Sequence, residues 1–157
     1  MIDIDGIDGK LLALLQRDAT QSTAQLAEQV GISQSPCWRR INRLESAGAI
    51  QRRVAILDRK ALGFGVEVFV RIKLSERGLR STEALEAAIL KLPEVLECHM
   101  LLGEIDYRLR VALPSLADYE RFLRDKLATL PGVRDIESSV VISEVKNETA
   151  LPLGRLG

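Results

Sequence analysis

Residues 22–48, STAQLAEQVGISQSPCWRRINRLESAG, decide how the first third of the chain folds. Ser22 followed three residues later by Gln25 predicts a capping box at the start of a helix. Gly31 stands after the last apolar position of that helix, where the left-handed residue that ends a helix is most easily a glycine. Ser33 is placed to cap a second helix. Two helices joined by a tight turn in this way form a helix-turn-helix.

The second helix of this motif has an apolar face and an arginine-rich face. Cys37, Ile41 and Leu44 recur at helical spacing and predict the buried face. At ~100° per residue, the polar side chains fall on the opposite side, with Trp38 and Arg40 on its flanks. Arginine forks match guanine edges and phosphates, and short polar side chains at a helix start can reach either. The expected DNA contacts, two of them from the segment after the helix, are Ser33, Gln34, Ser35, Trp38, Arg39, Arg40, Asn42, Arg43, Arg52 and Arg53.

An arginine-rich helix face also has a simpler interpretation, a solvated surface on an ordinary pair of helices. Here the caps, the turn glycine, the apolar stripe and the arginine face all agree, and this agreement favours DNA binding. Trp38 leaves two interpretations open. A lone tryptophan more often packs against a neighbouring helix than stacks on DNA.

Composition and charge limit the wider possibilities. A chain of 157 residues suits one or two small domains, and 46% hydrophobic residues are enough for packed cores. The formal net charge of zero argues against a generally basic nucleic-acid coat. However, residues 1–60 hold nine Lys and Arg against seven Asp and Glu. The positive charge is therefore local to the expected DNA face.

The sequence predicts a cytoplasmic, nucleoid-associated protein. Its acidic opening residues are unlike a signal peptide, and no apolar run approaches the ~20 residues of a membrane helix. Cys37 and Cys98 fall in different segments, which suits a reducing compartment rather than a disulfide framework.

We expect three regions along the chain. Residues 1–50 form the helix-turn-helix DNA-binding domain, completed by an opening helix over about residues 5–17. Residues 51–65 form an extended connector, and residues 66–157 form a ligand-binding and oligomerisation domain. The apolar face of the opening helix consists of Ile7, Leu11, Leu12 and Leu15.

The second domain alternates strands and helices. Period-2 and helical patterns place strands at 66–74, 95–102, 107–113 and 133–145, and helices around Leu85–Leu92 and Tyr119–Leu127. Both helices end in the same way, with Leu-Pro shortly before a valine that begins a strand. The order βαββαβ predicts a ferredoxin-like sheet with helices on one face. The fold class is therefore α+β, an N-terminal (winged) helix-turn-helix domain followed by this ferredoxin-like domain.

The other face of this sheet also needs a partner. Val66, Val68, Val70 and Ile72, set against Phe69, indicate apolar residues on both faces of the first strand. Dimerisation through the open face is the simplest solution.

This arrangement resembles the Lrp/AsnC (leucine-responsive and asparagine-regulator) family of transcription factors over nearly the whole chain. The stretches that carry the resemblance are IDGIDGKLLALLQRDA, LAEQVGISQSPCWRRINRLESAGAI, LDRKALG, LPEVLECHMLLGEIDYRLRV, YERFLRDKLATLPGV and VKNETALPL. The resemblance implies a homodimer, often assembled into tetramers or octamers, that binds paired half-sites in double-stranded DNA. It implies no cofactor, but a small effector, commonly an amino acid, whose binding changes assembly or DNA binding.

By the same resemblance, the effector lies at an interface between dimers. It would contact Met100 and the turn Gly103, Glu104, Ile105 and Asp106 of one subunit, with Ser139 and Val140 from a neighbouring subunit. Gly103 would let a ligand approach the backbone, and Asp106 could accept from an α-ammonium group. The alternative is that this turn only shapes a hairpin.

The chain departs from the family pattern in two places, one of which covers two residues. Family members usually have Tyr or Phe where this chain has Ile105, and Gly-Tyr where it has Arg52 and Arg53. The first departure bears on which effector, if any, this chain binds. The second would strengthen contact with DNA phosphates or change how the two domains pack.

Three rival functions remain. A siroheme-decarboxylase-like enzyme of the same architecture would need several His or Arg side chains around a cleft, and this chain has one histidine, His99. No cluster with metal-ligand spacing surrounds His99 and Cys98. A thiol sensor would use Cys37 at a helix start, although its apolar stripe favours inert packing. An effector-independent architectural DNA-binding protein is the third. We expect no enzyme activity.

Overall fold

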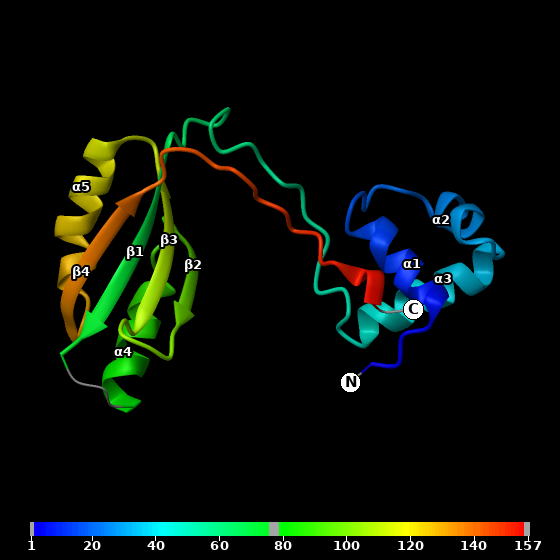
Figure 1. Ribbon diagram of the computed structural model, residues 1–157, viewed down its shortest axis with the longest axis horizontal. Coiled ribbons are helices and arrows are strands. Elements are labelled where there is room, and N and C mark those ends of the chain that lie inside the picture. Colours follow the sequence, from blue (N-terminus) through cyan, green and yellow to red (C-terminus); the bar gives the residue numbers. More distant parts are fainter. Residues whose placement is uncertain (1, 76–78, 156–157) are drawn as a thin grey trace. The chain divides into compact units, whose positions relative to one another are not determined.

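The computed structural model describes residues 2–75 and 79–155, which form two compact units (Figure 1). Unit 1 combines the chain up to Ile56 with the chain from Lys146 onward. Unit 2 is Leu57–Val145. No helix in the described ranges is long and apolar enough to cross a membrane.

Three helices form most of unit 1: α1 (Gly6–Leu15), α2 (Thr23–Val30) and α3 (Gln34–Ser46). Both expected caps of α2 are present. Ser22 and Gln25 close a reciprocal capping box, and Gly31 ends the helix with φ 73°. Ser33 is the N-cap residue of α3, but its side chain makes no capping hydrogen bond.

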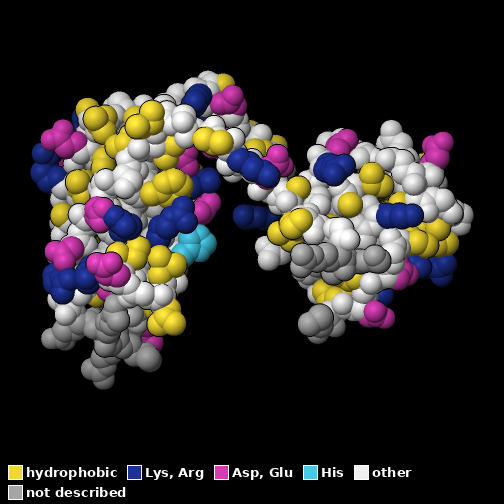
Figure 2. Space-filling model, in the orientation of Figure 1, with side chains coloured by type: hydrophobic (Ala, Val, Ile, Leu, Met, Phe, Trp, Pro, Cys, Tyr) yellow, Lys and Arg dark blue, Asp and Glu magenta, His cyan; other side chains and the backbone are white. Residues whose placement is uncertain are grey.

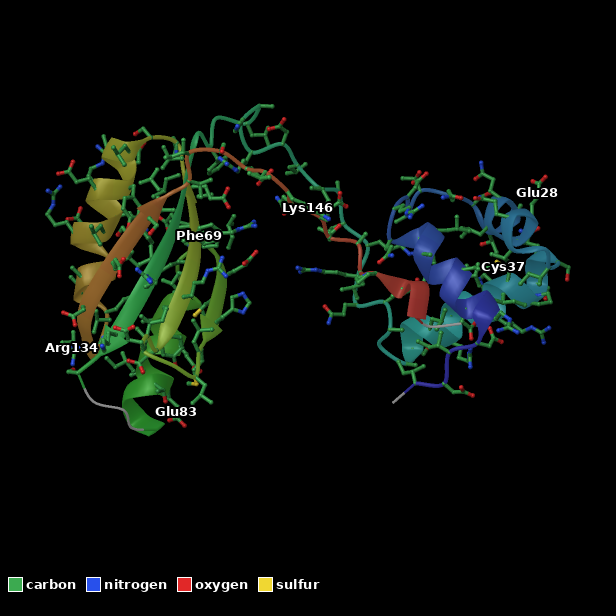
Figure 3. The ribbon with its side chains drawn as sticks, in the orientation of Figure 1. Glu28, Cys37, Phe69, Glu83, Arg134 and Lys146 are labelled. Atoms are coloured by element: carbon green, nitrogen blue, oxygen red, sulfur yellow. The ribbon has the colours of Figure 1, made fainter. Side chains whose placement is uncertain are left out.

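The core of unit 1 lies where the three helices meet. Its buried members are Leu11, Leu15, Leu26, Ala27, Cys37 and Ile41. Cys37 is fully buried, and its place among the helices of unit 1 is labelled in Figure 3. The apolar faces expected on α1 and α3 therefore pack together, with Leu26 and Ala27 of α2 in the same core.

The tail of the chain belongs to unit 1, which differs from the expected domain 66–157. The Gln16 side chain donates to the carbonyl of Leu151 at 2.9 Å and accepts from its amide at 2.8 Å. Leu151 and Leu153 line a cavity of about 600 Å³ together with Leu12 and Leu15 of α1. The short helix η2 (Leu153–Arg155) lies beside α1 (Figure 1). Two apolar tail residues thus find their partners on α1, a long-range pairing that periodicity does not reveal.

The segment after α3 is extended. Residues 51–58 belong to no helix or strand. They therefore do not form the β-stranded wing that a winged helix-turn-helix, the expected fold class, would have. Val54 and Ile56 in this segment are exposed.

Unit 2 has the βαββαβ order predicted from the sequence. Its elements are β1 (Val66–Leu74), α4 (Leu79–Ile89), β2 (Val95–Met100), β3 (Tyr107–Leu113), α5 (Leu116–Asp125), η1 (Leu127–Thr129) and β4 (Val133–Val140). The sheet is antiparallel with strand order β2-β3-β1-β4. This confirms the ferredoxin-like arrangement. β2 and β4 end earlier than expected, at Met100 and Val140.

One face of the sheet carries the core of unit 2. Val68, Val70, Ile72 and Leu74 of β1 are buried, and so are alternate residues of β3 from Tyr107 to Leu113. They pack with the apolar faces of the helices, through residues such as Leu85 of α4 and Phe122 of α5.

The other face of the sheet is charged, which corrects the expectation of apolar residues on both faces. Only Phe69 of the β1 residues on that face is a large apolar side chain, and the Arg108 guanidinium lies 4.3 Å from its ring centre. Glu67 is buried and pairs with Arg59 at 2.9 Å and with Arg110 at 3.4 Å. On the side of the molecule drawn in Figure 2, charged side chains are interspersed with hydrophobic ones. Alternation along β1 therefore separates a buried apolar set from a charged set.

Candidate nucleic-acid interface and effector region

The helix α3 presents the polar face expected of a DNA-reading helix. Exposed side chains run from its N-terminus along one side: Ser33, Gln34, Ser35, Trp38, Arg39 and Arg43, with Arg40 and Asn42 half-buried. Trp38 is 57% exposed and is not packed into the core. Cys37, Ile41 and Leu44 occupy the buried side, as their spacing predicted.

Two of these arginines are held by carboxylates at the start of α1. Arg40 Nη1 lies 2.6 Å from Asp5 Oδ2 and 2.9 Å from Asp8 Oδ1. Arg43 Nη2 pairs with Asp8 Oδ2. Asp5 also accepts from the amides of Ile7 and Asp8. Hydrogen bonds from the backbone and from Arg40 lower the pKa of Asp5 to about 2.

Asp8 is the residue of this interface that the sequence analysis missed. Its side chain is 0% exposed, and it completes the capping box of α1 by accepting from the Asp5 amide at 3.2 Å. The spacing of Asp5 and Asp8 could have indicated the cap. The contact with α3, more than thirty residues away, had no local signal.

Arg39 differs from its two neighbours. Among the described residues, no carboxylate pairs with it. Arg39, Arg40 and Arg43 line an open hollow of about 470 Å³ together with Asp5 and Pro36. The Asp5 carboxylate lies in the same hollow, and Arg40 and Arg43 are already paired, so Arg39 is the guanidinium there that suits a phosphate or a base edge.

The two connector arginines also differ from each other. Arg53 Nη2 lies 2.7 Å from Glu45 Oε1 of α3, with both side chains about 40% exposed. Arg52 is exposed. Both line the cavity between α1, the connector and the tail.

The residues expected to hold an effector are accessible with one exception. Met100 is 60% exposed, Gly103 and Glu104 are exposed, and Ile105 is half-buried. Asp106 is only 7% exposed. Its Oδ2 accepts from the Leu74 amide at 2.8 Å, so its carboxylate is engaged within the fold.

Ser139 and Val140 do not lie beside that turn in one chain. They are on β4, at one edge of the sheet, whereas Met100 ends β2 at the opposite edge. Val140 is 48% exposed. A site made of both sets would need two subunits.

The geometry gives little support to a thiol sensor at Cys37 or to a metal site. Burial raises the pKa of the Cys37 thiol, which disfavours the reactive thiolate. In the described ranges, no three His, Cys, Asp or Glu side chains come together as a metal site would require. His99 Nε2 lies 3.5 Å from a Glu97 oxygen on the charged sheet face.

Comparison with known proteins covers both units. An AsnC-type helix-turn-helix domain matches residues 4–45, and an Lrp/AsnC ligand-binding domain matches residues 67–151. The chain is 37% identical over 150 residues to the DNA-binding transcriptional activator DecR of Escherichia coli, covering 96% of this chain and 99% of the relative. It is 38% identical over 149 residues to the leucine-responsive regulatory protein of the same organism, covering 95% and 91%.

Solved structures agree with these matches. A transcriptional regulator from Neisseria meningitidis, in complex with L-Met, has a TM-score of 0.93 at 35% identity, covering 98% of this chain and 99% of the other. An AsnC family transcriptional regulator from Agrobacterium tumefaciens has a TM-score of 0.90 at 38% identity, covering 96% and 97%. With an AsnC-type helix-turn-helix and a ligand-binding domain in one chain, this protein belongs to the Lrp/AsnC family of DNA-binding transcriptional regulators.

Proposed function

We propose that α3 enters the major groove of double-stranded DNA and that its exposed polar face reads the operator. The observation that carries this proposal is the helix-turn-helix with its capped α2, left-handed Gly31 and exposed arginine face. Arg39, which has no carboxylate partner among the described residues, is the strongest candidate for a base contact. Ser33, Gln34 and Ser35 lie at the helix N-terminus, where side chains reach base edges.

A mobility shift tests this assignment. The probe is DNA upstream of the protein's own gene, measured at two salt concentrations against competitor DNA. Arg39→Ala should weaken specific binding by ~1–3 kcal/mol if the guanidinium reads a guanine. Arg124→Ala, which removes a 66% exposed arginine from unit 2, is the matched control and should bind like the wild type.

Arg52 is proposed as a phosphate contact. Arg52→Ala should weaken all DNA sequences similarly and reduce the salt dependence by about one counterion. If Arg39→Ala and Arg52→Ala both leave affinity unchanged, α3 does not dock as proposed.

The proposed effector is an amino acid bound between subunits. Relatives named for leucine response and a neighbour solved with L-Met support this class of ligand. Met100 and the turn 103–105 would contribute from one subunit, and Ser139 and Val140 from another, because the two sets lie at opposite sheet edges. Asp106 would hold the turn in shape, since its carboxylate already accepts from Leu74.

Calorimetric titration with L-leucine, L-methionine and L-glutamate separately tests the effector site. Met100→Ala should weaken binding of the responding amino acid, whereas Leu90→Ala, an 86% exposed leucine after α4, should not. Equal affinities for both variants would place the site elsewhere. A protein that binds none of the three but shifts DNA normally would be an architectural regulator.

Assembly completes the proposal. A homodimer places two recognition helices in successive major grooves, about 34 Å apart, and dimers join into tetramers or octamers. The effector changes DNA binding by preferring one assembly state. Such a protein acts on the bacterial nucleoid, which places it in the cytoplasm.

A further inference from the structure

The buried carboxylate of Asp8 stands out in unit 1 because it lies on a different helix from the arginines it holds. It is 0% exposed, and its two carboxylate oxygens pair with different arginines: Oδ1 with Arg40 and Oδ2 with Arg43. The side chains of these arginines are 29% and 49% exposed. A carboxylate withdrawn from water requires such partners, because its hydration is lost.

The charges in this cluster cancel. Asp5 and Asp8 contribute two negative charges, and Arg40 and Arg43 contribute two positive charges within hydrogen-bond distance. A phosphate that approaches α3 therefore meets two arginines whose charge is already compensated. Arg39, on the same helix, has no carboxylate partner among the described residues.

We infer that Asp8 is a positioning residue that fixes α3 on α1 and masks Arg40 and Arg43 from non-specific DNA. Base reading is then left to Arg39 and the residues at the start of α3. This inference rests on the proposed function of α3. It assigns Arg40 and Arg43 to orientation and charge balance rather than to independent DNA contacts.

Asp8 also has a second structural role, at the start of α1. Its oxygen also closes the capping box of α1, and a carboxylate in the first helical turn is favoured by the helix dipole. One side chain thus sets the start of α1 and the placement of α3 together. The packing of Leu11 against Cys37 and Ile41 in the same core supplies the apolar part of this contact.

The test is Asp8→Asn, which keeps the shape and removes the charge, in the full-length chain. Its affinity is measured for the operator identified by mobility shift and for a scrambled duplex, over a range of salt concentrations. Asp3→Asn, an exposed change of equal charge, is the control. Because Asp5 still pairs with Arg40, removing the Asp8 charge leaves one positive charge of the cluster uncompensated, and the salt slope on scrambled DNA should steepen by about 0.9, the value for one phosphate contacted.

The expected result for Asp8→Asn is tighter binding to scrambled DNA and a smaller ratio of specific to non-specific affinity. Asp3→Asn should change neither the ratio nor the slope. If Asp8 had only a structural role, Asp8→Asn would lower both DNA affinities and the unfolding midpoint but leave the salt slope unchanged. That result would overturn the inference.

Asp5→Asn keeps the test decisive if Asp8→Asn does not fold. Asp5 is 52% exposed and contacts only Arg40 of the two arginines, and its change also leaves one positive charge uncompensated, so the slope should steepen in the same direction by at most about 0.9. An unchanged slope in that variant would also overturn the inference. If Arg39→Ala weakens operator binding while both aspartate variants match Asp3→Asn, the masking role fails and the proposed function stands. If no variant and no wild-type protein binds DNA, the proposed function fails first.

Discussion

At the scale of the residue, the turn of the helix-turn-helix depends on Gly31. Its φ of 73° lies in the left-handed region, and a Cβ there would meet open space, so the strain is in the backbone alone. Gly31→Ala should therefore destabilise unit 1 by about 1–2 kcal/mol. Urea unfolding followed by circular dichroism measures this change.

Gly6→Ala provides the matched control for that change. Gly6 begins α1, has no positive φ, and a Cβ there also meets nothing within 4 Å. Alanine at that position should be neutral or stabilising by up to ~1 kcal/mol. A loss of stability at Gly6 as large as at Gly31 would show that the backbone argument is wrong.

The sequence predicts well those residues whose role is decided within a few positions. Ser22, Gln25 and Gly31 were identified from local capping rules, and Cys37 and Ile41 from helical spacing. Asp8 was missed because its partners come from another helix, and an aspartate at helix N3 looks like a cap alone. The hydrogen bond that the Leu74 amide donates to the Asp106 carboxylate is likewise beyond local rules, because the two residues are 32 positions apart.

At the scale of the element, two hydroxyl groups join helices to the sheet of unit 2. Tyr107 of β3 donates to Glu86 of α4 at 2.7 Å, and Tyr119 of α5 shares a hydrogen bond with Ser138 of β4. Burial raises the pKa of both tyrosines, and for Tyr107 the Glu86 carboxylate raises it further. Both phenols are therefore harder to deprotonate in the folded chain than in the unfolded chain.

This difference predicts alkaline unfolding. A group whose pKa is raised on folding contributes stability that is complete below its unfolded pKa of about 10 and is lost as the pH rises towards its folded pKa. Phenolate absorbance at 295 nm should thus appear only together with loss of circular dichroism. Since the chain has only these two tyrosines, phenolate formation near pH 10 in a folded chain would contradict the argument.

Element order was predictable from the sequence, while the ends of some elements were not. Alternation identifies β1 and β3 because each has one buried face. The strands β2 and β4 carry no buried residue, and their ends are the ones that the sequence placed too late. Residues 142–145 are exposed and lie beyond the last hydrogen bond to β1, which the Val141 amide donates to the Glu67 carbonyl at 2.9 Å. Phe69 alone does not make the second face of β1 apolar, because its neighbours on that face, Arg108 and Arg110 of β3, are charged.

At the scale of the whole molecule, the DNA-binding unit depends on a segment far along the chain. The Gln16 amide holds the Leu151 backbone through two hydrogen bonds. Gln16→Ala should release the tail and lower the free energy of unfolding by ~1 kcal/mol, the low end of the range for two exposed hydrogen bonds. Hydrogen exchange of the peptide around Leu151 should become faster in this variant.

A second variant controls for the loss of a glutamine side chain. Gln29 bonds only to Gln21 and to the Gln25 carbonyl among the described residues of unit 1. Gln29→Ala should leave exchange around Leu151 at the wild-type rate. If both variants speed exchange equally, the tail is not held by Gln16.

The two-part makeup of unit 1 has a consequence for biosynthesis. Residues 146–155 are translated after the whole of residues 57–145, so α1 is made long before the tail that packs against it. Domains generally fold as units while the chain is being made. The three helices that read DNA can therefore form early, but they acquire their contact with the tail only after all of unit 2 has been synthesised. A nascent chain stalled before Lys146 would lack the hydrogen bonds between Gln16 and Leu151.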